Sequence, residues 1–200
     1  MNNYLHPHYA DCLIKNIKMR LWTLINYSVA SYWRIKLGSG VRFNGKVYFN
    51  TLPKSKVFVG SNCIFNSSIT SNMIGVYTPC MISTLSNYAE IRIGTGCGFS
   101  GTVIAAAKQV IIGDNVRCGA NTMITDTDWH TDDYRAGIDA PVVIENNVWL
   151  GYGVKILKGV TIGKNSLIGA CSVVTRDVPP NCIASGVPCR VVRNLDNESI

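Results

Sequence analysis

Six aliphatic residues recur at exact six-residue intervals in the C-terminal half of the chain. In order, they are Ile144, Leu150, Ile156, Ile162, Ile168 and Val174. An α-helix repeats about every 3.6 residues and a half-buried strand repeats every second residue, so neither matches this period. A period of six is typical of a chain wound as a three-sided prism with one short strand on each side. The pattern therefore predicts an all-β solenoid whose stacked coils bury a continuous aliphatic column.

A less regular form of the same pattern runs back toward the N-terminus and indicates earlier coils. Its clearest members are Val59-Gly60, Phe65, Ile74-Gly75, Ile93-Gly94, Phe99, Ile112-Gly113, Cys118-Gly119 and Ile124. We expect the small residue after each aliphatic one to let the chain turn a tight corner. Pro179, Pro180 and Pro188 indicate where regular winding ends, because proline gives no donor to a strand ladder. The predicted β-helix covers residues 41–193, closes with a C-terminal cap and is followed by a tail at 194–200.

The second half of the repeat has one interruption, and it is polar. Ile124 and Ile144 are 20 residues apart, which is more than three six-residue sides. The residues between them are mostly polar and include Asp126, Asp128 and His130. A loop held by a rigid scaffold is a natural place for a functional site. We therefore predict a loop at 126–141 that protrudes from the coils.

Residues 1–40 lack the six-residue repeat, and we predict that they form a helical segment. Apolar residues recur there at three- and four-residue steps, as on one face of a helix. These residues are Leu13, Ile14, Ile17, Leu21, Leu24 and Ile25. The helix either packs on the prism or a neighbouring subunit, or it makes peripheral contact with a membrane, since Trp22 and Trp33 stand near lysines and arginines. Its apolar stretch is too short to span a bilayer.

Charge and cysteine content narrow the classes of function. The net charge is +7, but the basic residues are dispersed without a Lys/Arg run. This argues against nucleic-acid binding and favours an anionic small ligand or an anionic membrane surface. The eight cysteines form no CxxC pair and no zinc-type cluster, so we expect reduced, buried thiols and no metal site. Together with the lack of a signal-peptide pattern, this predicts a cytoplasmic protein, located at the inner face of the membrane if the helix binds there.

Two further motifs, with the polar loop, carry a resemblance to a known family. They are Val148-Trp149-Leu150-Gly151 and the run Gly186-Val187-Pro188-Cys189-Arg190-Val191-Val192-Arg193. Over about residues 55–193 the chain resembles the hexapeptide-repeat acyltransferases, in the sugar and surface-polysaccharide O-acetyltransferase branch. The resemblance implies a left-handed parallel β-helix and a homotrimer. It also implies transfer of acetyl from acetyl-CoA to a sugar hydroxyl in capsule or O-antigen biosynthesis.

His130 is the candidate catalytic base. It is the only histidine of the repeat region, and the family keeps its catalytic histidine in this loop. Histidine suits proton abstraction from a hydroxyl near neutral pH. Asp128 is the candidate carboxylate that orients its ring. We expect direct attack on the thioester, because no serine or cysteine has a recognisable nucleophile–base arrangement.

The resemblance also implies residues that hold the donor and the acceptor. Those expected along acetyl-CoA are Trp149, Gly151, Tyr152, Gly169, Ala170, Thr175, Arg176, Arg190 and Arg193. Tyr152 departs from the small residue often found there. The acceptor contacts of the galactoside enzymes cannot be carried over, because Ser100-Gly101 and Ala105–Ala107 stand in their place. The candidate acceptor contacts are instead Asp126, Trp129 and Arg135, and Trp129 could stack on a sugar ring.

Three other functions remain open from the sequence. An N-acetyltransferase of an amino-sugar nucleotide would use the same donor and fold. A non-catalytic β-helix scaffold would bind no CoA. A γ-type carbonic anhydrase would need three zinc-binding histidines, and the repeat region has one.

Overall fold

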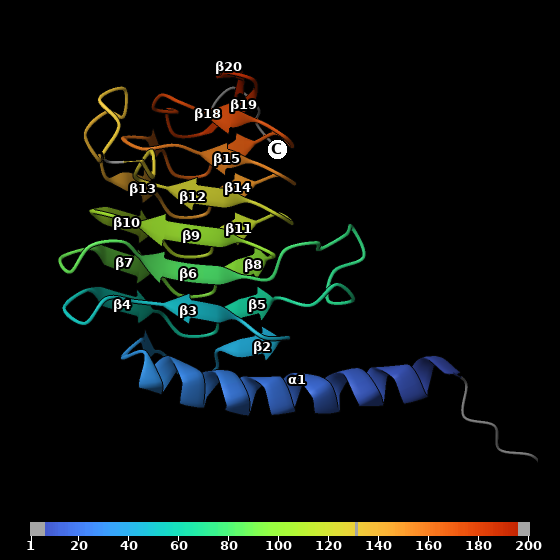
Figure 1. Cartoon of the computed structure of the whole chain (residues 1–200). Helices are drawn as coiled ribbons and strands as arrows, with labels where there is room; N and C mark the ends of the chain where they lie inside the picture. The colour runs from blue at the N-terminus through green and yellow to red at the C-terminus, as the bar shows by residue number, and fades with distance from the viewer. Residues whose placement is uncertain (1–6, 131, 196–200) are drawn as a thin grey trace, which may run out of the picture.

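The computed structural model describes residues 7–130 and 132–195, with side chains from residue 12 onward (Figure 1). Its main body is a three-sided prism of stacked coils, and each side is a sheet of parallel strands. Sheet A contains β1 (Lys36–Leu37), β4 (Lys56–Val59), β7 (Glu90–Ile93), β10 (Gln109–Ile112), β13 (Val142–Ile144) and β16 (Thr161–Ile162). Sheet B contains β2 (Arg42–Asn44), β5 (Ile64–Asn66), β8 (Gly98–Ser100), β11 (Arg117–Cys118), β14 (Trp149–Leu150), β17 (Leu167–Ile168), β19 (Cys182–Gly186) and β20 (Cys189–Asn194). Sheet C contains β3 (Tyr48–Asn50), β6 (Met81–Thr84), β9 (Val103–Ala106), β12 (Met123–Thr125), β15 (Lys155–Ile156) and β18 (Val173–Val174).

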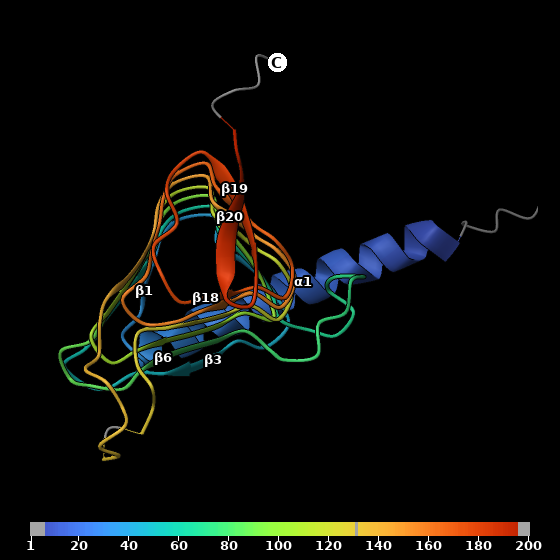
Figure 2. The same ribbon diagram turned by 90° about the horizontal axis from the view of Figure 1, so that it is seen from above.

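The prism winds as a left-handed helix. Successive strands pass from sheet A to sheet B to sheet C, and three strands complete one coil. Seen from the C-terminal end, this order runs clockwise while the chain rises toward the viewer (Figures 1 and 2). The predicted fold, a left-handed parallel β-helix, is therefore confirmed.

The core is a set of stacked columns, one behind each sheet. In sheet C, the ladder register places Ile82, Ile104, Ile124 and Ile156 directly above one another, and all are buried. Behind sheet B the lower coils stack aromatic rings instead. The ring centroids of Phe43 and Phe65 are 5.2 Å apart, and those of Phe65 and Phe99 are 4.9 Å apart. Each coil alone buries little apolar area, so the columns stabilise the prism only when several coils stack.

The corners depend on two residue types with separate roles. A Cβ atom on Gly60 would lie 2.5 Å from the carbonyl oxygen of Gly94 in the next coil, so glycine is needed there for close stacking. The tight turn itself is made two residues later by Asn62, with φ of 60°. Asn147 and Asn165 have the same conformation, and the Asn147 side chain donates to that of Asn165 at 3.2 Å. The predicted turning role of the glycine is therefore corrected at these corners: the asparagine turns the chain, and the glycine lets the coils approach. At two other corners a glycine makes the turn itself, because Gly96 and Gly153 have φ of 73° and 66°.

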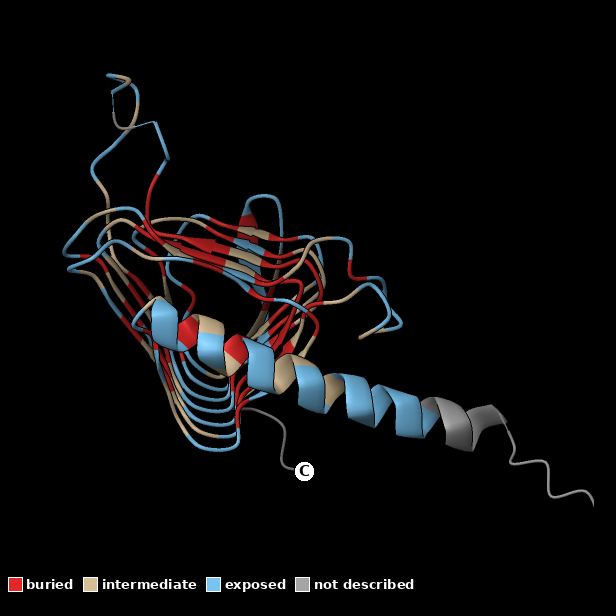
Figure 3. Cartoon of the chain, turned by 60° about the horizontal axis from the view of Figure 1, so that its bottom comes forward, coloured by how far each residue is buried: buried red, intermediate tan, exposed pale blue. Residues whose placement is uncertain are grey.

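The helix α1 (Pro7–Tyr32) covers the N-terminal end of the prism and extends beyond it (Figures 1 and 3). It ends in a Schellman motif, in which Arg34 has φ of 57° and the Ile35 N–H donates to the Ala30 carbonyl at 2.9 Å. Asn26 is buried, donates to the Gly45 carbonyl at 3.0 Å and accepts from the Val47 N–H at 3.0 Å. The face that contacts the prism is therefore mixed, with buried Asn26 and Ala30 and with Tyr27 packed against the core, and the predicted apolar face points elsewhere. No helix in the described residues has the length and apolarity needed to cross a bilayer.

The first half of the prism carries a second protruding loop. The 34-residue spacing from Val59 to Ile93 predicts short bulges or insertions in this half but does not locate the loop. Residues 67–80 leave the prism between β5 and β6 (Figure 1). Ile74 is exposed and Gly75 has φ of 100°, so the predicted repeat unit Ile74-Gly75 is wrong. The loop is anchored by Asn121, whose side chain donates to the Gly75 carbonyl at 2.8 Å and accepts from the Tyr77 N–H at 3.1 Å.

Six of the eight cysteines are buried thiols, as predicted, whereas Cys12 and Cys171 are exposed. The six buried cysteines are Cys63, Cys80, Cys97, Cys118, Cys182 and Cys189. Burial raises the pKa of Cys80 to about 11 and also raises that of Cys118. The Cys80 and Cys118 thiols therefore stay protonated near neutral pH and act as small apolar side chains.

Candidate active site

The polar loop 126–141 begins directly after β12, and Asp126 fastens both of its ends. The Asp126 carboxylate is fully buried and accepts from the N–H groups of Ala107, Lys108 and Gln109 at 2.6, 2.7 and 2.6 Å. Its carbonyl accepts from the Ala140 N–H at 3.0 Å, where the loop returns to the prism. A buried carboxylate needs such donors, and here they are backbone groups of the coil turn. The prediction that Asp126 contacts the acceptor is therefore wrong, because no part of it reaches the surface.

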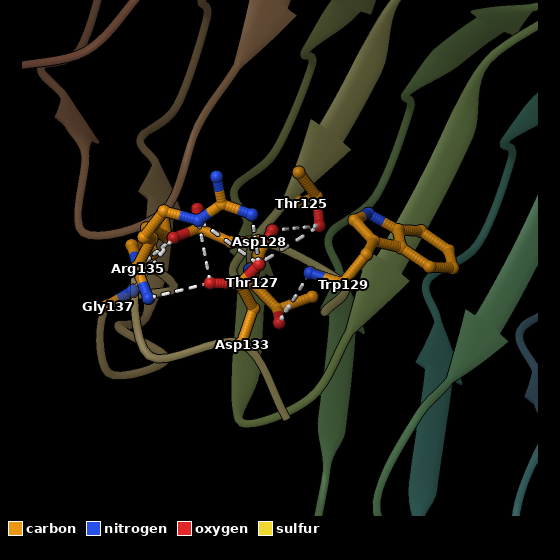
Figure 4. Close-up of polar contacts among 8 residues, drawn as sticks. Thr125, Thr127, Asp128, Trp129, Asp133, Arg135 and Gly137 are labelled. Atoms are coloured by element: carbon orange, nitrogen blue, oxygen red, sulfur yellow. Dashed lines mark hydrogen bonds and ion pairs between the residues drawn. The ribbon is translucent and has the colours of Figure 1, made fainter. Parts of the chain in front are cut away.

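Two threonines set the path of the chain from β12 into the loop (Figure 4). The Thr125 hydroxyl contacts both the N–H and the carbonyl of Thr127, at 3.4 and 3.3 Å. The Thr127 hydroxyl in turn accepts from the Trp129 N–H at 3.2 Å. Trp129 is held at φ of 72°, a conformation that costs about 1–2 kcal/mol for a residue with a side chain. Its ring is 50% exposed and points away from Asp133 and Arg135.

His130 follows Trp129 and is exposed at the surface of the loop. Its carbonyl accepts from the Asp133 N–H at 3.1 Å, which fixes the backbone at this point. In residues 7–130 and 132–195, no side chain is hydrogen-bonded to the imidazole. The ring is therefore accessible to a substrate, and no carboxylate of the described residues orients it.

Asp128 contacts Lys158 and not His130, which corrects its predicted orienting role. One Asp128 carboxylate oxygen accepts from Lys158 Nζ at 2.6 Å and from the Gly137 N–H at 3.1 Å. The Lys158 ammonium, followed by the Gly137 N–H, holds the pKa of Asp128 below its ordinary value. The pair joins the loop to the coil above it, so Asp128 is a loop-positioning residue. Lys158 lies 30 residues from Asp128 in sequence, so no local sequence motif indicated this contact.

Arg135 has a carboxylate partner of its own in the loop. Its Nε atom donates to both oxygens of Asp133, at 2.9 and 3.2 Å, and its Nη2 atom donates to one of them (Figure 4). Hydrogen bonds from Arg135 lower the pKa of Asp133. Both side chains are in contact with solvent, so the pair is weak. An anionic acceptor could compete for Arg135 by displacing this carboxylate.

The residues predicted to lie along acetyl-CoA are divided between two edges of the prism. The corner from sheet B to sheet C, here called the glycine edge, contains Gly119, Gly151 and Gly169 at successive levels. Trp149, Tyr152 and Ala170 flank it. A Cβ on Gly151 would lie 2.7 Å from the Ala170 backbone nitrogen, so coil stacking alone already requires this glycine. Trp149 is half-exposed and Ala170 is exposed, which leaves both accessible to a ligand.

Thr175 and Arg176 instead follow β18, at the corner from sheet C to sheet A. The loop 126–141 leaves the prism at this same corner, here called the loop edge. Thr125 ends β12 two ladder spacings below, about 10 Å along the axis. Arg190 and Arg193 lie on β20 in the cap, where Arg190 Nη1 donates to the Cys189 carbonyl at 2.7 Å. Arg176, Arg190 and Arg193 thus place positive charge at the C-terminal end of the prism.

One chain therefore does not bring the candidate groups together. Sheet C separates His130, on the loop edge, from Trp149 and Gly151, on the glycine edge, and both Figures 1 and 2 show the loop and that corner at opposite ends of the sheet. Among the described residues, no group of three or more His, Cys, Asp or Glu side chains is placed to hold a metal ion.

The comparisons with known proteins agree with the geometry. Residues 141–176 match the family described as bacterial transferase hexapeptide (six repeats). Galactoside O-acetyltransferase of Escherichia coli is 48% identical over 92 residues, which cover 44% of this chain and 45% of that protein. Galactoside O-acetyltransferase of Lactococcus lactis is 37% identical over 146 residues, covering 70% of this chain and 63% of that protein. The chain thus spans less than two thirds of either relative.

Two solved structures have the same fold over nearly the whole chain. The N-acyltransferase AntD from Bacillus cereus superposes with a TM-score of 0.59 at 15% identity, covering 98% of this chain and 93% of AntD. A hexapeptide-repeat acetyltransferase from Vibrio cholerae superposes with a TM-score of 0.54 at 24% identity, covering 95% and 90%.

A left-handed prism of hexapeptide coils with a polar loop on one corner defines the class of hexapeptide-repeat transferases. The chain belongs to the hexapeptide-repeat acetyltransferase family.

Proposed function

We propose that this chain is an acetyl-CoA-dependent O-acetyltransferase that acylates a sugar hydroxyl in surface-polysaccharide biosynthesis. The observation that carries the proposal is the 37% identity to a galactoside O-acetyltransferase across 70% of the chain. The exposed His130, on a loop whose ends are fastened by buried Asp126, provides a candidate base. Buried thiols such as Cys80 and Cys118 fit a reducing, cytoplasmic location.

The donor proposed for this site is acetyl-CoA. AntD, which has the same fold, was solved with Coenzyme A. Guanidinium groups pair well with phosphates, so Arg176, Arg190 and Arg193 are suited to the anionic end of such a donor. Trp149 and Ala170, which are accessible on the glycine edge, would then lie along its pantetheine arm.

The proposed reaction is a direct transfer with His130 as general base. The imidazole accepts the proton of a sugar hydroxyl while the hydroxyl oxygen attacks the thioester carbonyl carbon. The resulting tetrahedral species collapses as the carbon–sulfur bond breaks. The departing thiolate takes a proton from the imidazolium, so His130 returns to its neutral form. Trp129 is available to stack on the acceptor ring, since its indole is half-exposed.

The proposed assembly is a homotrimer whose sites lie between adjacent prisms. The glycine edge of one chain would hold the donor, and the loop edge of the next would supply His130, Thr175 and Arg176. Such a head-to-tail interface closes into a ring when the rotation between neighbours is threefold. This arrangement accounts for why His130 and Trp149 occupy opposite edges of sheet C within one chain.

The test is an acetyl-transfer screen with acetyl-CoA and a panel of sugars and glycan precursors, read by mass. We expect His130→Ala to reduce turnover by about 10²–10⁴-fold. His130→Ala should leave thermal stability and oligomeric state unchanged, because the side chain is exposed. Thr127→Ser, which keeps the hydroxyl that holds the Trp129 N–H, is the matched control in the same loop and should retain activity.

Three outcomes would contradict the proposal in different ways. Near-native turnover by His130→Ala would remove the histidine from the mechanism. Acetylation of amine acceptors alone would indicate an N-acetyltransferase. Failure of CoA to raise the melting temperature, with no turnover on any acceptor, would favour a non-catalytic scaffold.

A further inference from the structure

The net positive charge of the chain is concentrated at one end of the prism. After Asp11, the next acidic residue is Glu90, and the residues between them include nine lysines and arginines. Residues 90–200 contain ten basic and eleven acidic residues, so they are close to neutral. Residues 12–89 form most of α1 and the first two coils, β1–β6. The basic residues that are dispersed in sequence therefore gather at the N-terminal end in the fold, here called the basic pole.

The helix α1 adds an uncovered apolar stripe to this pole. Leu13, Ile17, Leu21 and Leu24 fall within an arc of about 80° on the helix and are each more than half exposed. Asn26 and Ala30 are fully buried on the opposite side, against the prism. Lys18 and Arg20 flank the stripe on its two sides. Figure 3 shows the exposed residues along the length of the helix.

A groove lies between α1 and the loop 67–80. Its volume is about 740 Å³. The helix contributes Lys15 and Lys18 together with the apolar side chains of Met19 and Trp22. The loop contributes Met73 and the hydroxyl-bearing residues Ser68, Thr70 and Ser71. Figures 1 and 2 both place the loop beside the outer half of the helix.

We propose that the basic pole docks on an anionic membrane and that the groove binds the phosphate-bearing headgroup of a membrane lipid. Lys15 and Lys18 supply the charge for a phosphate, and the hydroxyls of Ser68 and Thr70 supply neutral donors. The apolar stripe inserts at the level of the headgroups, as in interfacial helices with basic flanks. Charge complementarity favours this occupant over a second copy of the chain, because two basic poles repel one another.

The docked orientation leaves the candidate active site free. The loop 126–141 leaves the prism in its upper half, well away from α1 in Figure 1. Acetyl transfer and membrane docking are therefore separate properties. Failure of one in an experiment would leave the other intact.

The experiment is flotation of the 200-residue chain with phosphatidylcholine vesicles, with and without phosphatidylglycerol. We expect binding only to the anionic vesicles, and its loss at high salt as the surface charge is screened. Lys15→Glu/Lys18→Glu should lower the partition coefficient by at least about thirtyfold, the loss expected from removing two basic residues near an anionic surface, because the two glutamates are also repelled by it. Lys155→Glu/Lys164→Glu makes the same change of net charge at the other end of the prism and should bind like the wild type. Leu13→Ser/Ile17→Ser/Leu24→Ser, all at exposed positions, should also lose binding.

The proposal is overturned if the wild-type protein does not float with anionic vesicles at low salt, or if it binds neutral vesicles equally well. If the two lysine variants lost vesicle binding equally, binding would depend only on net charge, and the groove would not be a headgroup site. Light scattering tests the remaining alternative, which is that the apolar stripe is an interface between copies of the chain. If the serine variant lowers the oligomeric state, the stripe is an interface between copies of the chain and not a membrane contact.

Discussion

At the scale of single residues, Asp126 illustrates how a buried carboxylate can serve the site without touching substrate. Its three short bonds to backbone N–H groups hold the turn at Ala107–Gln109 against the root of the loop. Asp126→Asn would leave one oxygen acceptor and would turn an amide donor toward N–H donors. We expect a loss of about 3 kcal/mol in unfolding free energy, since hydrogen bonds to a buried charge are strong and unpaired donors are costly. Chemical denaturation would measure it.

The control for that substitution is Asp139→Asn in the same loop. Asp139 is half-exposed, so removing its charge should change stability by less than about 0.5 kcal/mol. If Asp126→Asn destabilised the protein no more than Asp139→Asn does, the hydrogen bonds of Asp126 to the 107–109 backbone would not contribute to stability as expected.

The Asp128–Lys158 contact should make the loop sensitive to acid. The pKa of Asp128 is lowered in the folded protein, so its contact is fully present above the ordinary aspartate pKa and is lost as pH falls through the lower folded value. Near neutral pH, Asp128→Asn should speed hydrogen exchange of the Gly137 amide by at most about fivefold, because the pair is partly exposed. This difference from the wild type should shrink to nothing in acid. A difference that persists at low pH would contradict the assignment.

At the scale of elements, the glycines of the prism should divide into required positions at the corners, such as Gly60, and dispensable positions within strands, such as Gly98 in β8. A Cβ on Gly60 meets the Gly94 carbonyl oxygen at 2.5 Å, whereas a Cβ on Gly98 meets no atom within 4 Å. We expect Gly60→Ala to destabilise the prism by about 1–3 kcal/mol through forced separation of two coils. Gly98→Ala should be neutral or slightly stabilising, because it reduces the freedom of the unfolded chain. Thermal melts of both variants would check this, and equal melting temperatures would argue against close stacking at Gly60.

The elements that could be predicted from sequence are those specified by local spacing. The aliphatic residues from Ile144 to Val174 identified the inward positions, because a six-residue coil repeats the same environment. The loop 126–141 was visible as a break in that spacing. The position of the loop 67–80 was not, because Ile74-Gly75 resembles a repeat unit although Ile74 is exposed, so the broken spacing in the first half indicated only short interruptions. The orientation of α1 was also missed: its polar residue Asn26 hydrogen-bonds the backbone of Gly45 and Val47, so the face that holds Asn26 and Ala30 turns inward and the apolar stripe does not.

The candidate site was less predictable than the fold because its contacts join distant coils. His130 could be selected from composition alone, as the single histidine of the repeat region. The hydrogen-bond partners of the two aspartates could not be predicted in this way. Ala107 lies 19 residues from Asp126, and Lys158 lies 30 residues from Asp128. Nearness in sequence made Asp128 a plausible partner for His130. In the folded chain, the Asp128 carboxylate instead binds the ammonium group of Lys158 in the next coil.

At the scale of the whole molecule, the division of candidate residues between two edges predicts a site shared by neighbouring chains. His130→Ala would inactivate the loop edge. Ala170→Glu would inactivate the glycine edge, because Ala170 is exposed there and a carboxylate would repel an anionic donor. Each variant alone should be inactive. Co-expressed in one cell, the two should recover activity, since some interfaces then join one intact loop edge to one intact glycine edge.

The size of the recovery follows from the symmetry. With random mixing, each edge of a shared site is intact half the time, so about a quarter of the wild-type activity should return for a closed head-to-tail ring. Affinity tags of two kinds would isolate the mixed assemblies, and each variant carrying both tags would serve as the control. Mixed assemblies without activity would contradict the shared site and would require His130 to reach the donor within its own chain. That would need the loop to cross the whole width of sheet C, against the clamp at Asp126 that fixes both of its ends.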